Sequence, residues 1–366
     1  MEETRAYDTW RALAEKALKG APLSSLDTPI DDGGTGTAAT LPPLRFPATP
    51  LYAGRHTLGP WDVVQRVDSD TGSARQARED LENGATALAV VLAGAPSAYG
   101  RGLTAATVDA LGDALLGVHL DLVPLQVEAG ARSLEALALL KALADRRGTM
   151  PAALHLGADP FGAAQATGAA RSAAATGKTL AATLLAFQAL GIPGTALAAD
   201  GRIAAEAGSS PAQELAFMLL SLHAATTMLE EAGIAPSDAI PAIALRLSAS
   251  HDQFATIAKL RAARRLHRLY TDAYGLDVPA TLHVTTLWRM LAVSDPHTNL
   301  LRLSLAAFAA GTGGADAVTV LPFDETAQPL GRRMARNIQT LLLEEAHVSA
   351  IADPGAGSGS IEALTD

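Results

Sequence analysis

Two glycine-containing segments have spacings that could hold phosphate. Residues 176–179 (TGKT) end like a nucleotide-binding P-loop, but Ser172 stands where that loop needs its first glycine. Residues 355–357 (GAG) begin like a dinucleotide-binding fingerprint, but Ser360 stands at its third glycine position. We therefore interpret the first segment as part of a helix and the second as a glycine-rich loop.

A histidine follows an aspartate by two positions in residues 295–300 (DPHTNL). This order begins the D-x-H-x-x-G motif, whose histidine binds the cobalt of cobalamin, but Leu300 replaces the glycine. We prefer a helix N-cap, in which Asp295 precedes a proline and His297 is exposed. Residues 344–347 (EEAH) do not match the zinc motif H-E-x-x-H. The sequence therefore predicts no metal site.

Basic residues crowd one expected helix, residues 259–270 (KLRAARRLHRLY). They are Lys259, Arg261, Arg264, Arg265 and Arg268. A nucleic-acid surface needs a positive field, whereas 28 Lys and Arg face 38 Asp and Glu, a formal net charge of −10. We therefore expect these side chains to pair with carboxylates within the chain or across an interface, and we expect neither nucleic acid nor an anionic membrane as partner.

The composition favours a cytoplasmic protein. Cysteine is absent, which removes disulfides, thiolate nucleophiles and Cys-ligated metals. The N-terminus is acidic and lacks a signal-like apolar segment, and no uninterrupted apolar run reaches the length of a membrane span. Hydrophobic residues make up 49% of the chain but aromatic residues only 4%, which suits Ala- and Leu-rich helices packed around a sheet.

Short apolar runs that alternate with helical stretches predict the elements that position any site. The expected strands are 87–93, 120–127, 152–156, 195–200, 243–248, 281–286, 316–322 and 348–353. Eight strand–helix units close into an α/β (β/α)8 TIM-type barrel, whose chemistry lies at the C-terminal ends of the strands. Too few residues follow the last run for an eighth helix, so we expect either that the sequence is cut short here or that the gene ends early.

The segment before the barrel is expected to be an arm. Residues 3–19 form an amphipathic helix with Trp10, Leu13 and Leu18 on one side, and residues 31–37 and 41–44 have turn and extended chemistry. We divide the chain into an N-terminal helix and arm over residues 1–80, which would contact another subunit, and a barrel over residues 81–366.

Prolines and acids at three helix starts are interpreted as structural. Asp159 and Asp295 each precede a proline, and Ser210 precedes Pro211 with Gln213 placed for a capping box.

Several segments resemble methylmalonyl-CoA mutases, and they occur in the same order. They are 60–65 (PWDVVQ), 206–208 (EAG), 213–217 (QELAF), 257–266 (IAKLRAARRL), 323–325 (FDE), 335–345 (ARNIQTLLLEE) and 353–365 (DPGAGSGSIEALT). The resemblance implies an adenosylcobalamin enzyme that interconverts methylmalonyl-CoA and succinyl-CoA by a radical. It also implies a thioester threaded along the barrel axis, with cobalamin at one end. The family's cobalamin-ligating histidine lies in a further C-terminal domain, which we expect to be absent here.

Four positions depart from the pattern that the resemblance implies for catalytic members. Arg66 replaces a tyrosine that lies over the substrate, and Ile203 replaces the histidine that hydrogen-bonds the thioester. Arg202 replaces the tyrosine before that histidine, and Gly157 replaces a glutamine. The segment with the carboxylate-binding arginine has no evident counterpart. These losses predict a degenerate site without catalytic, cofactor-binding or metal-binding residues.

We therefore expect the non-catalytic small subunit of a heterodimeric mutase, with adenosylcobalamin bound by a catalytic large subunit. A homodimer is the alternative assembly. The alternative function is an active acyl-CoA mutase component that uses a cobalamin domain from another chain, with Arg66 and Arg202 adapted to a different acyl group. A barrel axis filled by Leu, Met or Arg side chains favours the first hypothesis. An open bore lined by Ser and Thr favours acyl-CoA binding.

Overall fold

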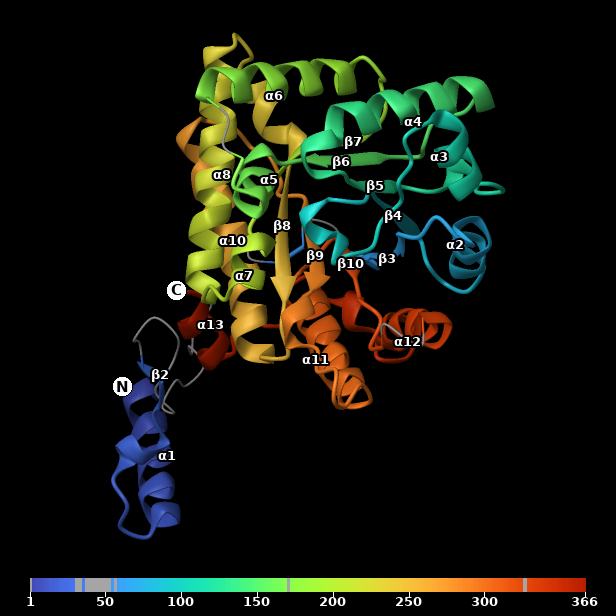
Figure 1. The fold of residues 1–366 in the computed structure, drawn as a ribbon. Helices are drawn as coiled ribbons and strands as arrows, with labels where there is room; N and C mark the ends of the chain where they lie inside the picture. The colour runs from blue at the N-terminus through green and yellow to red at the C-terminus, as the bar shows by residue number, and fades with distance from the viewer. Residues whose placement is uncertain (1, 30–34, 37–53, 56–57, 170–171, 325–327) are drawn as a thin grey trace.

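The computed structural model describes residues 2–29, 35–36, 54–55, 58–169, 172–324 and 328–366. Within these residues, parallel strands close into an eight-stranded barrel with helices around it (Figure 1). The strands neighbour one another in the order β10-β3-β4-β5-β6-β7-β8-β9. Their bounds are β3 (Asp62–Val67), β4 (Ala87–Val91), β5 (Leu125–Glu128), β6 (Leu154–Ala158), β7 (Gly194–Asp200), β8 (Ile243–Ala249), β9 (Leu282–Thr286) and β10 (Ala317–Thr319). The α/β barrel predicted from the sequence is confirmed.

The helices cover the outer face of the sheet, where strand residues such as Leu88, Leu154 and Leu245 are buried. Their bounds are α2 (Ser73–Glu82), α3 (Val108–Ala114), α4 (Ser133–Arg147), α5 (Pro160–Thr167), α6 (Ala173–Gln188), α7 (Arg202–Ala207), α8 (Pro211–Glu231), α9 (Pro236–Ala239), α10 (Gln253–Ala273), α11 (Thr298–Thr312), α12 (Gln328–Thr340) and α13 (Gly359–Thr365). No helix in the described ranges has both the length and the apolar composition needed to span a bilayer.

One strand differs from the sequence prediction. Residues 348–353 do not form a strand, since a 3-10 turn, η9 (Val348–Ala350), lies there. The remaining strand is β3, which lies inside the segment 1–80 that was assigned to an arm. Its polar residues Gln65 and Arg66 interrupt the apolar run in the sequence, although both are buried in the structure. With β3 as the first strand, β10 is the eighth. The helix that follows it is α12, so the eighth helix, which was expected to be missing, is present.

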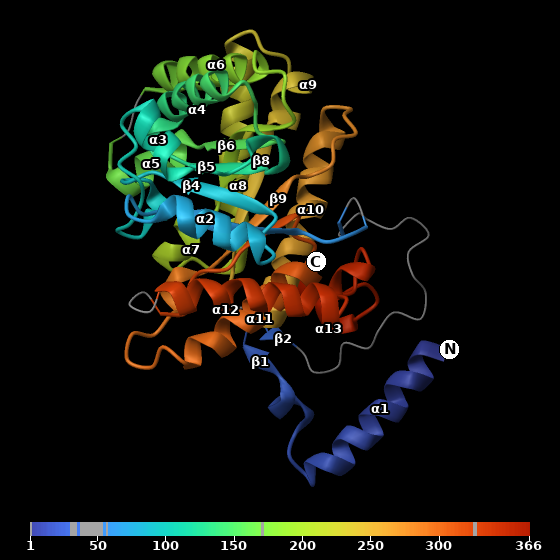
Figure 2. The same cartoon turned by 90° about the vertical axis from the view of Figure 1, so that its right-hand side faces the viewer.

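The N-terminal region contains the expected helix, α1 (Glu2–Leu18), and a small antiparallel pair, β1 (Thr28–Pro29) with β2 (Thr35–Gly36). Figure 2 shows α1 extending away from the barrel. Leu13 is 64% exposed, and the ring of Trp10 lies 5.9 Å from that of Tyr7. The rest of the predicted arm, residues 31–34, 37 and 41–44, lies outside the described residues.

Two of the three predicted helix caps are confirmed. Asp159 accepts hydrogen bonds from the N–H groups of Phe161 and Gly162 at the start of α5. Ser210 and Gln213 form the reciprocal capping box at the start of α8. The third prediction is shifted, because α11 begins at Thr298 and its N-cap residue is His297. Asp295 still accepts a hydrogen bond from the Thr298 N–H in the preceding turn.

The basic side chains of helix α10 pair with carboxylates of the same chain. This is one of the two arrangements predicted from the sequence; the other was pairing across an interface. The pairs are Lys259 with Glu214, Arg261 with Asp353 and Glu362, Arg264 with Asp316, Arg265 with Asp366, and Arg268 with Asp272 and Asp277. Arg261 connects α10 to the C-terminal helix α13, and its guanidinium is buried. The positive charges of these residues are therefore paired within the chain and do not form a positive surface for nucleic acid.

A buried ion cluster joins α2 to α12, the helices that follow the first and last barrel strands. Asp80 has no exposed surface, and its carboxylate pairs with Arg332 at 2.5 Å and with Arg336. Arg332 also donates to the main-chain oxygen of Arg66 in β3. Because buried charges are stable only when paired, this cluster holds the closing segment of the barrel in place.

We predict that Asp80→Asn lowers the free energy of unfolding by about 3 kcal/mol, because it removes the countercharge of the buried Arg336 and leaves Arg332 only the more distant Asp68, at 3.8 Å. Urea unfolding followed by circular dichroism measures the change. The matched control is Asp109→Asn, which breaks an ion pair with Arg146 in which both side chains are more than half exposed, and it should cost less than about 1 kcal/mol. Equal costs for the two variants would contradict the role assigned to the cluster.

Candidate functional site

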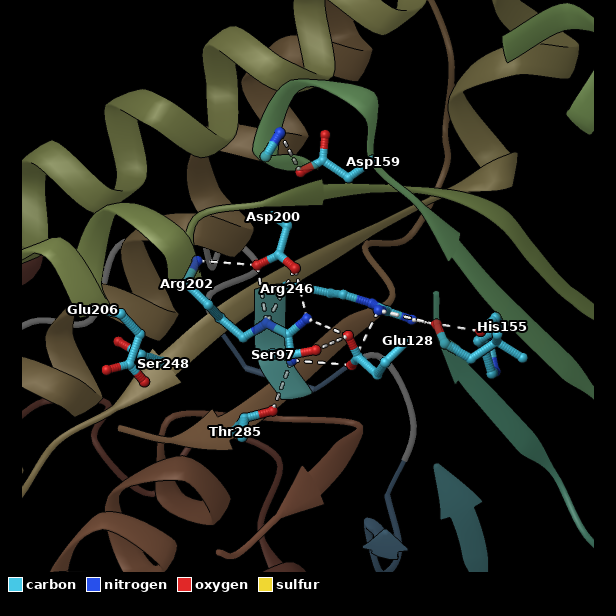
Figure 3. Close-up of polar contacts among 12 residues, drawn as sticks. Ser97, Glu128, His155, Asp159, Asp200, Arg202, Glu206, Arg246, Ser248 and Thr285 are labelled. Atoms are coloured by element: carbon cyan, nitrogen blue, oxygen red, sulfur yellow. Dashed lines mark hydrogen bonds and ion pairs between the residues drawn. The ribbon is translucent and has the colours of Figure 1, made fainter. Parts of the chain in front are cut away.

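Charged side chains meet inside the barrel near the C-terminal ends of its strands (Figure 3). Glu128 is the last residue of β5, and Asp200 is the last residue of β7. Arg202 begins α7, and Arg246 lies within β8. All four are at least nine-tenths buried. The parallel strands bring them together because every strand in such a barrel ends at the same face.

The guanidinium of Arg202 has every N–H group occupied. Its Nε donates to Asp200 at 2.9 Å, and its Nη2 donates to Asp200 at 2.5 Å and to Glu128 at 2.9 Å. Its Nη1 donates to Glu128 at 3.0 Å and to the hydroxyl of Thr285 at 3.1 Å. Since arginine has five N–H donors, none is left for a ligand.

Glu128 is shared by two arginines. Its Oε1 lies 3.1 Å from Nη1 of Arg246, and its Oε2 accepts a hydrogen bond from the Ser97 hydroxyl at 2.7 Å. Burial by itself would raise the pKa of Glu128, but the charges of Arg202 and Arg246 hold that pKa well below its usual range. The carboxylate is therefore ionised and fully engaged with protein groups.

Two histidines lie next to Arg246 in the barrel interior. The rings of His155 in β6 and His283 in β9 meet edge to face, with centroids 4.5 Å apart. Burial, with the Arg246 charge, lowers the pKa of His155 to about 4, and burial also lowers the pKa of His283. Both rings are therefore neutral at pH 7 and pack in the barrel interior.

The structure brings the four departing positions close together. Gly157 in β6 and Ile203 in α7 line one cavity with Arg202. Arg66 lies at its edge, where its guanidinium is 5.5 Å from the ring of Tyr99 and its Nη1 donates to the Ser97 carbonyl at 2.9 Å. Their shared location is a structural finding, whereas their description as lost catalytic positions stays a prediction.

Two stacked aromatic residues, Tyr99 and Trp288, line the outer side of this cavity, and we call this pair the lid. The rings of Tyr99 and Trp288 stack with centroids 5.3 Å apart and planes 8° from parallel. Glu206 from α7 connects the two residues, because it accepts hydrogen bonds from the Tyr99 hydroxyl at 3.0 Å and from the main-chain N–H of Trp288 at 2.8 Å. The lid connects the loops that follow β4 and β9 across the barrel mouth.

The cavity beneath the lid has a volume of about 280 Å³ and is rich in carboxylates. Its lining includes Glu128, Asp159, Asp200 and Glu206. Burial, together with the Asp200 charge, raises the pKa of Asp159 to about 7. Two arginines also line it: Arg202, whose guanidinium is already neutralised, and Arg289, which is exposed.

His297 is the candidate that the sequence offered for binding a cobalt ion, and its surroundings do not fit that role. It is exposed at the start of α11, with its ring 5.9 Å from Phe323. Asp295 uses its carboxylate in the turn that precedes the helix. Across the described ranges, no three His, Asp or Glu side chains are grouped so that they could hold a metal.

The site residues predicted from the sequence did not include Glu128, Asp200 or Arg246. Each lies within or one residue beyond an expected strand that is otherwise largely apolar. A charged residue at the C-terminal end of a barrel strand points into the mouth, so this position was the available signal. Tyr99 and Trp288 lie in loops and gave no comparable signal.

The chain is a closed (β/α)8 barrel with a polar cluster at the C-terminal end of its strands. Barrels of this class carry their enzymatic sites at this face. The family model for methylmalonyl-CoA mutase matches residues 33–366. The chain therefore belongs to the methylmalonyl-CoA mutase family, as the resemblance in its sequence segments predicted.

Relatives with the name methylmalonyl-CoA mutase small subunit match most of the chain. The protein from Streptomyces virginiae is 38% identical over 98% of this chain and 61% of its own length. That from Propionibacterium freudenreichii subsp. shermanii is 32% identical over 83% of this chain and 49% of its own length. A Mycobacterium bovis protein, named a probable small subunit, is 36% identical over 94% of this chain and 58% of its own length. The chain thus spans about half to three-fifths of these relatives.

We predict that Asp159→Asn removes a pH dependence of stability between about pH 4 and pH 7. Because the folded-state pKa of about 7 exceeds the ordinary aspartate pKa of 3.8, folding favours the protonated acid, and wild-type stability falls as pH rises through this range. The asparagine still caps α5 and should raise the free energy of unfolding by about 1–2 kcal/mol at pH 8.

Chemical unfolding at pH 4, 6 and 8 measures this effect. The matched control is Asp252→Asn, at the exposed N-cap of α10, which should keep the wild-type pH profile. A wild-type profile for Asp159→Asn as well would show that the buried acid does not titrate in this range.

Proposed function

We propose that this chain is the non-catalytic small subunit of an adenosylcobalamin-dependent methylmalonyl-CoA mutase, in which a partner large subunit carries out the isomerisation. The observation that carries the proposal is the occupied guanidinium of Arg202. This arginine directly precedes Ile203, where the family resemblance implies the histidine that hydrogen-bonds the thioester, and all of its donors are bound within the protein.

The chemistry of the rearrangement explains why this matters. A radical isomerisation of an acyl thioester requires donors fixed on the thioester oxygen and a cation near the free carboxylate of the substrate. Ile203 has no donor, and Gly157 has no side chain. At the same site Arg202 and Arg246 are paired with Glu128 and Asp200, so this cluster offers no free cation to the carboxylate of the substrate. The scaffold is thus retained without groups that would bind and activate this substrate.

The cofactor of the assembly is assigned to the partner. Adenosylcobalamin supplies the radical when it is bound; the candidate ligand for its cobalt in this chain, His297, lies in an incomplete motif whose Asp295 is engaged in the turn before α11. The names of the relatives support a large subunit as the partner. The amphipathic helix α1, which extends from the barrel with Leu13 exposed, supports a subunit contact through the N-terminal region.

We predict that co-expression with the catalytic large subunit yields one complex by size-exclusion chromatography, and that methylmalonyl-CoA turnover needs the large subunit. This chain alone, mixed with adenosylcobalamin, should show no turnover. Turnover by this chain with only an isolated cobalamin domain added would instead identify an active acyl-CoA mutase component. Elution of the two co-expressed chains as separate monomers at micromolar concentration would refute the subunit proposal.

We predict that Leu13→Asp weakens the complex at least tenfold, because it places a charge on the apolar side of α1. Leu185→Asp, which changes a 56% exposed leucine on the barrel helix α6, is the matched control and should leave the affinity unchanged. Surface plasmon resonance with immobilised large subunit measures both dissociation constants. Equal affinities for the two variants would remove α1 from the interface.

A further inference from the structure

We propose that Arg246 is a plug across the barrel axis, and that Gly157 is glycine because the plug occupies the space of its side chain. The inference rests on the proposed function only for the ligand that is excluded, a CoA thioester threaded along the axis. The plug itself is a statement about packing inside this barrel, and it is tested on the isolated chain.

The contacts of Arg246 cross the barrel interior. The residue belongs to β8, and its guanidinium reaches Glu128 and the Val127 carbonyl in β5 and the His155 carbonyl in β6. In the strand order of the closed barrel, β6 and β7 stand between β5 and β8. A side chain that connects β8 to β5 therefore passes through the space enclosed by the strands. Arg246 is only 1% exposed, so protein atoms surround it.

Gly157 supplies the room for this side chain. A Cβ atom at Gly157 would lie 2.2 Å from Nη2, 2.3 Å from Cζ and 2.3 Å from Nη1 of Arg246. Such distances are far inside van der Waals contact, and the guanidinium is held by neighbours on several strands. The backbone at Gly157 also has φ +61°, in the left-handed region, where the strand register shifts between His155 and Ala158. Any side chain here would displace the plug.

Glu128 and the two histidines complete the closure. Glu128 neutralises the buried charge of Arg246 on one side, and Arg202 holds Glu128 from the other. His155 and His283 pack against each other in the same interior. The cavity beneath the lid is lined by Gly157 and Glu128, so it ends where the plug begins. An extended thioester that entered at the mouth would therefore meet Arg246.

A double-mutant cycle on the isolated chain tests the plug. Gly157→Ala should lower the midpoint of thermal unfolding by about 5 °C when Arg246 is present. In an Arg246→Ala background the same change should lower it by only about 1 °C, because only the backbone strain remains. Arg264→Ala is the matched control background, since Arg264 is equally buried and paired with a carboxylate outside the axis. In that background the full effect of about 5 °C should persist.

Methylguanidinium provides a second measurement that does not depend on Gly157→Ala folding well. At low millimolar concentration it should raise the unfolding midpoint of Arg246→Ala by 2 °C or more, because it refills the vacated space beside Glu128. It should not stabilise the wild type or the double variant Gly157→Ala/Arg246→Ala, in which the methyl group occupies that space. Equal costs of Gly157→Ala in all backgrounds, or equal rescue of the single and double variants, would overturn the plug.

These outcomes are separate from the proposed subunit role. A failed cycle would leave an open axis in a chain that still binds the large subunit, whereas failed complex formation would leave the plug intact. The two proposals thus have independent tests.

Discussion

The carboxylate of Glu128, held between the guanidinium groups of Arg202 and Arg246, is the interaction on which the interior of this barrel depends. A buried carboxylate or a buried arginine by itself carries a large desolvation cost, and each is stable here because the others supply countercharge and hydrogen bonds. The cluster contacts β5, β7, β8 and β9 at once. Removal of Glu128 would leave Arg246 without its ion-pair partner, and removal of Arg202 would leave Asp200 without its own.

The packing of this barrel separates what holds its shape from what fills its axis. The outer faces of the strands remain apolar and pack against the helices, so the fold does not depend on what fills the axis. The axis is free to hold ligand or protein side chains. Here arginine, glutamate and histidine side chains occupy it, and the small cavity that remains at the mouth is lined by acids beneath a Tyr99–Trp288 lid.

The prediction of the fold from the sequence succeeded where strands are continuous apolar runs. Seven of the expected strands overlap observed ones, because strands of a parallel barrel are buried on both faces. It failed at β3, where Gln65 and Arg66 disguise a buried strand, and at residues 348–353, where an apolar run forms a turn. The error moved the start of the barrel and removed a helix from its end. Local pattern alone cannot reveal a polar residue that finds its partner on another strand.

The sequence by itself determined the family and the barrel, because these follow from residue order, apolar runs and segment matches. It also indicated that the basic residues of α10 pair with carboxylates. Only the tertiary structure decided which carboxylates they meet, and that Gly157 and Arg246 share one space. The reason is geometric: residues distant in the chain become neighbours only when the sheet closes, and steric exclusion between them leaves no local sequence pattern.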